Sequence, residues 1–245
     1  MVALDAGRLA LEAGASGRTV AELVERTARG LGAERVDLRI GYASLAVTIG
    51  IGGDGITRMR RVGPHGVNQR LDAALRALAA RVSRGELDHA ATRVALERLP
   101  RDTPGQPAWF VAAAVGLACA AFGRLLGVDW HGSVPVFLAS TLGQALRGFL
   151  LARRANVFLA VNVVAFSSSL LAGLGARWAG SDTMDGAMIA AVLLLVPGVP
   201  ALNALNDILE GRPTLGSARA VFVAVVLIFV TVGIGLGKAF LGEAR

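Results

Sequence analysis

The stretch 188–219, MIAAVLLLVPGVPALNALNDILEGRPTLGSAR, determines how the rest of the chain is organised. It begins as an uncharged apolar run, is interrupted at Pro197-Gly198-Val199-Pro200, and continues with Asn203, Asn206 and Asp207. Two prolines three residues apart end or kink a helix, because each removes a backbone donor and clashes with the preceding turn. Inside a bilayer the freed backbone groups need protein or a water-lined cavity. The pattern therefore predicts a broken membrane helix, the kind of element from which transporters build midplane sites.

A simpler interpretation is an ordinary helix that ends at Val196 and is followed by a polar loop at the membrane surface. Against it, Asn203, Asn206 and Asp207 are three or four residues apart and share one face of a continuing helix. Such a polar stripe is expected to face protein or water rather than lipid. For Asp207 we consider three roles: a substrate contact, a proton site, or an ion-pair partner of Arg147 or Arg219.

Composition places this stretch in a membrane protein with a polar portion. The chain has 245 residues, 54% of them hydrophobic, and a mean hydropathy of +0.57. Residues 1–104 hold 16 of the 25 basic and 12 of the 18 acidic residues, which leaves the remaining 141 residues sparsely charged. We therefore predict two domains, a soluble one over 1–104 and a membrane domain over 105–245.

Several classes of function find no support. The net charge of +7 comes from basic residues that are interleaved with acids or grouped at loop ends, so we expect no nucleic-acid binding. The single cysteine, Cys119, excludes an intramolecular disulfide, and the three histidines have no neighbour at metal-ligand spacing, so no metal is predicted. No pairing of a nucleophile with a base is visible, so we predict neither an enzyme nor a cofactor. The N-terminus has no uninterrupted apolar core, and we expect no signal peptide.

The first hundred residues predict an α+β fold. Apolar stripes indicate helices over Val2–Ala13 and Thr19–Leu31, with Gly14 ending the first and Ser16 capping the second. Strands are expected over Val36–Ile40, Ala43–Ile51 and Ile56–Val62, with Gly52-Gly53-Asp54-Gly55 as a hairpin turn rather than a phosphate loop. Helices Gln69–Arg84, capped by Asn68, and Leu87–Leu99 follow, and Pro100–Pro107 forms the linker.

Five apolar segments near the ~20 residues that a bilayer requires follow the linker: Trp109–Leu126, Val134–Leu151, Val157–Trp178, Ala187–Ile208 and Ala218–Leu236. The short loops between them alternate between basic and poor in Lys and Arg. By the positive-inside rule, this predicts a cell inner (plasma) membrane protein whose N-terminal domain is cytoplasmic and whose C-terminus is outside.

Polar residues within these segments are the candidates for a transport path. Gln144 lies in the second segment, and Asn162 and Ser167-Ser168-Ser169 lie in the third. Together with the broken segment they predict a solute site formed by Gln144, Asn162, Pro197, Gly198, Pro200, Asn203, Asn206 and Asp207. Four arginines on the predicted cytoplasmic side could attract an anion: Arg147, Arg153, Arg154 and Arg219.

Four motifs resemble the threonine/serine exporter (ThrE-type) family: LEAGASGRTVAELVERTARGLG, GITRMRRV, GELDHAATRVALERL and LVPGVPALNALNDILEG. The resemblance covers roughly residues 4–236, and its signature falls on Pro197, Gly198, Pro200, Asn206 and Asp207. It implies export of a small polar metabolite, an amino acid or a dicarboxylate, by secondary transport. Because the chain stops after five spans, it is more similar to the split form, in which a YjjP-like larger subunit works with a small YjjB-like membrane subunit and is associated with succinate export.

An alternative is a non-transporting membrane scaffold or sensor, whose cytoplasmic domain binds a ligand and regulates a partner membrane protein. The expected partners are the lipid bilayer, a small polar solute, the small membrane subunit and further copies of the chain. A homo-oligomer would bury a polar stripe that five spans leave exposed.

Overall fold

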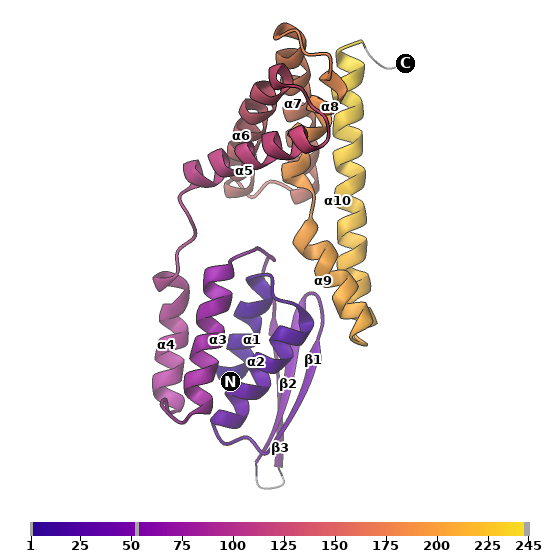
Figure 1. Ribbon diagram of the computed structural model, residues 1–245. Coiled ribbons are helices and arrows are strands. Elements are labelled where there is room, and N and C mark those ends of the chain that lie inside the picture. Colours follow the sequence, from indigo (N-terminus) through magenta and orange to yellow (C-terminus); the bar gives the residue numbers. More distant parts are fainter. Residues whose placement is uncertain (1, 52–53, 243–245) are drawn as a thin grey trace. The chain divides into compact units, whose positions relative to one another are not determined.

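The computed structural model describes residues 2–51 and 54–242, which are mostly helical and include one small sheet (Figure 1). The chain forms two compact units. The first consists of the residues up to Gly105 together with Gly198–Val221, and the second of Gln106–Pro197 together with the residues from Phe222 onward. The first boundary lies beside the predicted one, but the structure adds Gly198–Val221, which we had placed in the membrane domain, to the first unit.

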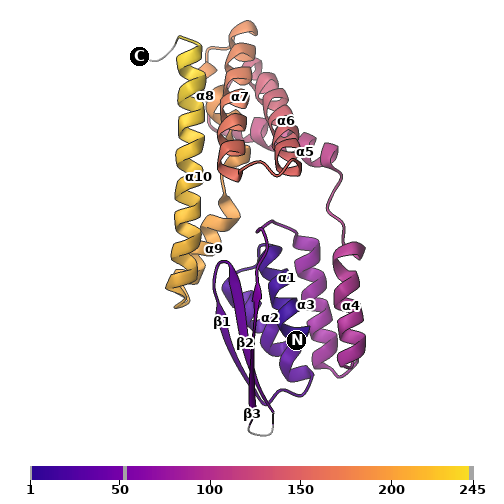
Figure 2. The same ribbon diagram turned by 180° about the vertical axis from the view of Figure 1, so that it is seen from behind.

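The first unit contains a three-stranded antiparallel sheet covered by helices on one face (Figures 1 and 2). The strand order is β1-β2-β3, and β2 pairs with β3 from Ser44 opposite Arg61 to Gly50 opposite Gly55. Strands β2 and β3 are the two strands of the predicted hairpin. Gly52 and Gly53 of the predicted turn lie outside the described residues. The elements are α1 (Val2–Glu12), α2 (Gly17–Gly30), β1 (Arg35–Ile40), β2 (Ser44–Ile51), β3 (Asp54–Arg61), α3 (Gln69–Ser83) and α4 (His89–Asp102).

Local sequence explains the ends of these helices. Gly14 has a φ of +92°, the left-handed conformation that a glycine after a helix end adopts at little cost. The Ser16 side chain accepts a hydrogen bond from the Thr19 amide, which caps α2 as predicted. Helix α4 continues through Pro100 to Asp102, so the linker starts later than expected.

The late segment of the first unit consists of α9 (Gly198–Leu209) and the start of α10 (Pro213–Phe240). Gly211 has a φ of +77° in the turn between them, and Pro213 suits the first position of a helix. A Cβ on Gly216 would lie 2.8 Å from the Ala204 carbonyl oxygen, so the two helices approach closely because this residue has no side chain.

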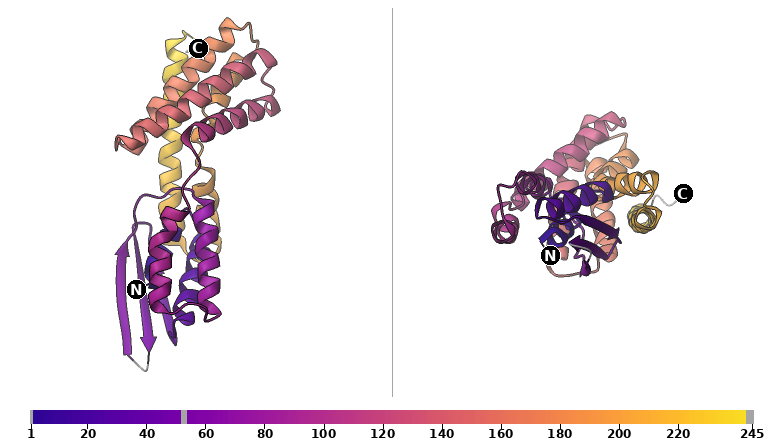
Figure 3. Two further views of the ribbon diagram at one scale, coloured as in Figure 1. Left: turned by 90° about the vertical axis from the view of Figure 1, so that its left-hand side faces the viewer. Right: turned by 90° about the horizontal axis from the view of Figure 1, so that it is seen from below.

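The second unit contains helices that can span a membrane. Helices α5 (Ala108–Leu125), α6 (Trp130–Ala152) and α7 (Val157–Trp178) pack in chain order (Figure 3). They are followed by α8 (Met184–Ala191), the short helix η1 (Leu193–Leu195) and the remainder of α10. Helix α6 begins earlier than predicted because Asp129 caps it, its carboxylate accepting from the Gly132 amide at 2.6 Å.

Four described helices are long and apolar enough to cross a membrane, namely α5, α6, α7 and α10. The predicted fourth span is a bent pair, Met184–Leu195 and Gly198–Leu209, with an angle of 62° between its halves. The break predicted at Pro197–Pro200 is therefore confirmed. Helix α10 has 28 residues, about 42 Å at 1.5 Å per residue, which exceeds a hydrocarbon core of about 30 Å.

Candidate functional site

The polar face of α9 contacts the turn between α1 and α2. The Asn203 side-chain amide donates to the Gly14 carbonyl oxygen at 2.9 Å, and the Gly17 amide donates to the Asp207 carboxylate at 2.8 Å. Arg219 of α10 donates to the Ala15 carbonyl oxygen at 3.0 Å and to the second Asp207 oxygen at 2.5 Å. We call these contacts the turn–helix junction, formed by Gly14, Ala15, Gly17, Asn203, Asp207 and Arg219. It joins two of the four motifs on which the family resemblance rests, those of residues 11–32 and 195–211.

The junction is a buried ion pair oriented by backbone groups. Asp207 is 0% exposed and Arg219 is 4% exposed. The carboxylate also lies at the start of α2, where the helix dipole favours a negative charge. A Cβ on Gly17 would lie 2.6 Å from the carboxylate, so only glycine leaves room for it. Among the three roles considered for Asp207, the structure contains the ion pair with Arg219, and this arginine faces Asp207 rather than solvent.

Tyr42 belongs to the surroundings of this ion pair. Burial raises the pKa of its phenol, and the positive charge of Arg219 opposes that rise. The phenol is therefore neutral at pH 7 and adds no charge beside the pair. Its ring stacks on His65, with 4.4 Å between the ring centroids.

The remaining predicted residues around the break differ in their surroundings. Pro200 lies in the first turn of α9, where a missing amide proton leaves no helical bond unmade. Pro197 lies between η1 and α9, so the two prolines separate two helices instead of bending one. Gly198 and Asn206 are exposed, and the Asn206 side chain forms no hydrogen bond or ion pair with a described residue, although Asn203 and Asp207 on the same side of α9 do.

Asn162 belongs to the second unit, whereas the residues of the turn–helix junction belong to the first. Its side-chain amide donates to the Phe229 carbonyl oxygen of α10 at 3.0 Å. It also borders an apolar depression of about 440 Å³ that α7 and α10 form. The described contacts therefore do not bring Asn162 together with Asn203 and Asp207.

Gln144 and Arg147 lie on α6, on a face that also carries Ser140 and Gly143. Both are half-buried in the second unit, and Arg147 forms no ion pair with any described residue. Arg153 and Arg154, in contrast, are exposed at the end of α6, and Arg153 lies over the Phe149 ring. The sequence analysis missed Ser140 and Gly143. Ser140 lies four residues before Gln144 and Gly143 lies four residues before Arg147, and this helical spacing was the available signal.

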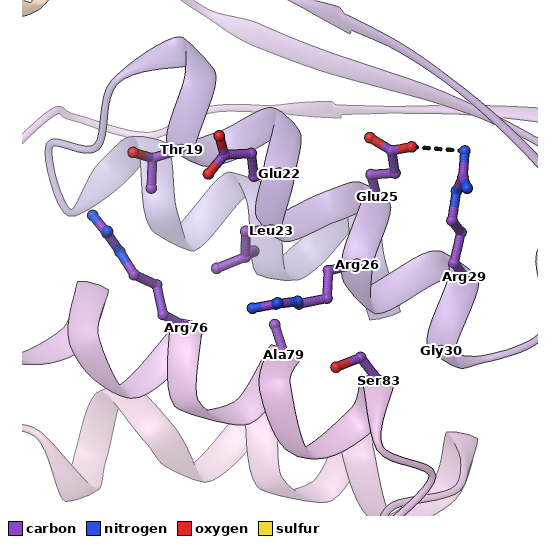
Figure 4. Close-up of a pocket in the computed structure, with 10 residues that line it drawn as sticks. All are labelled: Thr19, Glu22, Leu23, Glu25, Arg26, Arg29, Gly30, Arg76, Ala79 and Ser83. Carbon is purple, nitrogen blue, oxygen red and sulfur yellow. Dashed lines mark ion pairs between the residues drawn. The ribbon is translucent and has the colours of Figure 1, made fainter.

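An open groove of about 690 Å³ lies between α2 and α3 of the first unit (Figure 4). Its basic side chains are Arg26, Arg29 and Arg76. Arg29 pairs with Glu25 at 2.8 Å, whereas Arg26 has no ion-pair partner in the described part of the chain and extends toward Ala79. In the ranges 2–51 and 54–242, no group of three or more His, Cys, Asp or Glu side chains could hold a metal ion.

Comparison with known proteins gives three matches. The model of the ThrE family, described as "Putative threonine/serine exporter", matches residues 1–241. A protein of Klebsiella aerogenes named "Probable succinate transporter subunit YjjP" is 30% identical over 95% of this chain and 90% of its own length. A protein of the same name from Escherichia coli K12 is 30% identical over 98% of this chain and 93% of its own length. No solved structure was found to match the chain.

Proposed function

The chain belongs to the threonine/serine exporter (ThrE) family, and we propose that it exports a small polar metabolite by secondary transport. It is a membrane transport protein, in keeping with the names of its relatives. The candidate solutes are amino acids such as threonine and serine, which the family description mentions, and dicarboxylates such as succinate, which the relatives' names mention.

The broken helix is the observation that supports this proposal most. Its two halves meet at 62°, and the boundary between the two compact units falls between Pro197 and Gly198. A rearrangement at Pro197–Pro200 would therefore move one half with the second unit while the turn–helix junction holds α9 to the first unit. Transporters use such discontinuous helices to alternate access to a polar cavity. In this mechanism Asn203 and Asp207 fix α9, and Gln144 and Asn162 contact the path.

We further propose that the chain acts with a small membrane subunit and that its first unit is cytoplasmic. Both relatives are named as subunits, which supports a partner chain. The alternation of basic and non-basic loops supports the orientation. A homo-oligomer would give the exposed apolar residues of α9, Leu202, Leu205 and Leu209, a surface to bury against.

The test is solute movement in proteoliposomes that contain the chain, with and without a small YjjB-like subunit, supplied with labelled threonine, serine and succinate. We expect one of these solutes to move and Pro197→Ala/Pro200→Ala, which favours a straight helix, to slow it at equal protein abundance. Pro104→Ala is the matched control, because this exposed proline lies in the linker between α4 and α5 and outside the broken helix. Normal transport by the proline variant would refute the role of the break.

The alternative, a scaffold or sensor subunit, is favoured by the groove between α2 and α3. If no solute moves even with the partner present, this alternative becomes the better explanation. Arg26→Glu would reverse the charge at this position of the groove or close the groove with a salt bridge. Weaker association of this variant with the partner would then support the scaffold or sensor role.

A further inference from the structure

Four residues of α6 form a continuous polar stripe. Ser140, Gly143, Gln144 and Arg147 follow one another at spacings of three, one and three residues and thus share one face of the helix. Ser140 and Gly143 are buried, and Gln144 and Arg147 are half-buried. At 1.5 Å per residue, Arg147 lies about 7.5 Å from the end of α6 and Ser140 about 18 Å from it. The stripe therefore extends from near one end of the helix to its middle.

The buried part of this stripe faces the interior of the second unit beside the break. The Ser140 hydroxyl donates to the carbonyl oxygen of Ala191, the last residue of α8, at 3.1 Å. A Cβ on Gly143 would lie 2.1 Å from the Ser168 hydroxyl oxygen of α7 and 3.5 Å from a methyl carbon of Leu194 in η1. Ser168 is thus directed at the stripe, at a point where α6 carries no side chain.

Two polar groups at the stripe have no partner in the described part of the chain. Ser168 is 0% exposed, and its hydroxyl forms no hydrogen bond. Arg147 carries a positive charge in an apolar helix without a counter-charge, whereas the buried Arg219 pairs with Asp207. Leaving a buried hydroxyl or charge unpaired is unfavourable, and in membrane helices unpaired ionisable groups mark the paths of substrates and ions.

We propose that this stripe binds a carboxylate, with Arg147 as its cationic contact and Gln144 and Ser168 as hydrogen-bond donors. A guanidinium presents a planar pair of donors that matches a carboxylate in a bidentate arrangement. The carboxylate is the group that amino acids and dicarboxylates share, so the site accounts for recognition of either solute class. The role of this site in transport rests on the proposed function. Binding of a carboxylate at the site can be measured without transport.

The test is calorimetric binding to the purified full chain in lipid nanodiscs, with succinate and threonine as probes and with succinamide and threoninamide as neutral-ended counterparts. We expect at least one acid to bind and its amide to bind about tenfold more weakly or not at all. Arg147→Gln should weaken binding of the acid by about tenfold or more, and Arg147→Lys by less. Arg177→Gln, at an exposed arginine in the last turn of α7, is the control and should change nothing. Equal binding of acid and amide, or full binding by Arg147→Gln, would overturn the proposal.

Ser168→Ala separates a binding role from a packing role. If the hydroxyl only packs, its removal relieves an unpaired polar group and leaves acid binding unchanged, which contradicts the proposal. If it contacts the ligand, the variant is as stable as the wild type or more stable, yet binds the acid several-fold more weakly. Transport that persists in Arg147→Gln with unchanged affinity would leave the proposed function intact and refute only this site.

Discussion

The buried ion pair of the turn–helix junction makes a quantitative prediction about single and double substitutions. Removing one partner of a buried pair leaves the other charge desolvated and is expected to cost about 3–5 kcal/mol. We expect Asp207→Asn to approach that value, because it removes the negative charge that balances the buried Arg219, while the Ala15 carbonyl oxygen is a neutral acceptor. Arg219→Gln should cost less, since Asp207 keeps the Gly17 amide and the favourable start of α2.

The double variant Asp207→Asn/Arg219→Gln should be less destabilised than the sum of the single variants by about 2 kcal/mol or more, because no buried charge remains. The reversed pair Asp207→Arg/Arg219→Asp should not restore stability. Its arginine would face the Gly17 amide and its aspartate the Ala15 carbonyl oxygen, and both contacts are repulsive.

The assay is unfolding of the purified full chain by denaturant, combined with hydrogen exchange of the peptide that contains Gly17. This amide should exchange faster in Asp207→Asn than in the control Asn206→Ala, because it loses its charged acceptor. Single variants within about 0.5 kcal/mol of the wild type, or a reversed pair that recovers full stability, would refute the reasoning.

Three further predictions concern close approaches and a helix cap. Gly17→Ala should destabilise the first unit by about 1–3 kcal/mol and accelerate its proteolysis, because the new methyl group meets the Asp207 carboxylate; unchanged proteolysis would contradict this. Gly143→Ala should lower the melting temperature, and Gly143→Ala/Ser168→Ala should recover most of the loss, since without the hydroxyl the nearest serine atom lies at 3.4 Å. Donation chiefly by the Gly132 amide holds the pKa of Asp129 below its usual 3.8, so its ionised form stabilises the fold above that pH. Asp129→Asn should therefore melt lower than the wild type at pH 7, and the difference should shrink as the pH falls below about 4; a difference independent of pH would refute this.

Local features of the fold could be predicted from the sequence. Val157–Trp178 was predicted with the bounds that α7 has, and the caps at Ser16 and Asn68 accept the expected backbone donors. The break at Pro197–Pro200 was predicted because proline acts within one turn of helix. Each of these features depends on neighbours within about four residues, which periodicity and capping rules describe.

The long-range contacts could not be predicted in the same way. Asp207 binds an amide 190 residues earlier, at Gly17, and no periodicity relates the two. The apolar residues of α9 predicted part of a membrane span, and together with Met184–Leu195 it is long and apolar enough for one; its polar contacts with the turn between α1 and α2 could not be predicted. For the candidate site, the sequence identifies the polar residues but does not show which of them lie close together in the structure. The spacing of Ser140 and Gly143 places them on the face of α6 that carries Gln144 and Arg147, but only the packing of α7 and α8 shows that this face is buried.

The discontinuity of the first unit has a consequence for synthesis of the protein. The ribosome makes residues up to Gly105 first and returns to this unit only at Gly198, about 90 residues later. At 5–20 residues per second, the interval is roughly 5–20 s. During that time the Gly17 amide and the Ala15 carbonyl oxygen have no partners from α9 and α10, and the early part of the unit must persist without them. Completion of the N-terminal unit thus depends on prior synthesis of helices α5 to α8, so a chain that is interrupted among them presents an unfinished domain that chaperones and proteases can recognise.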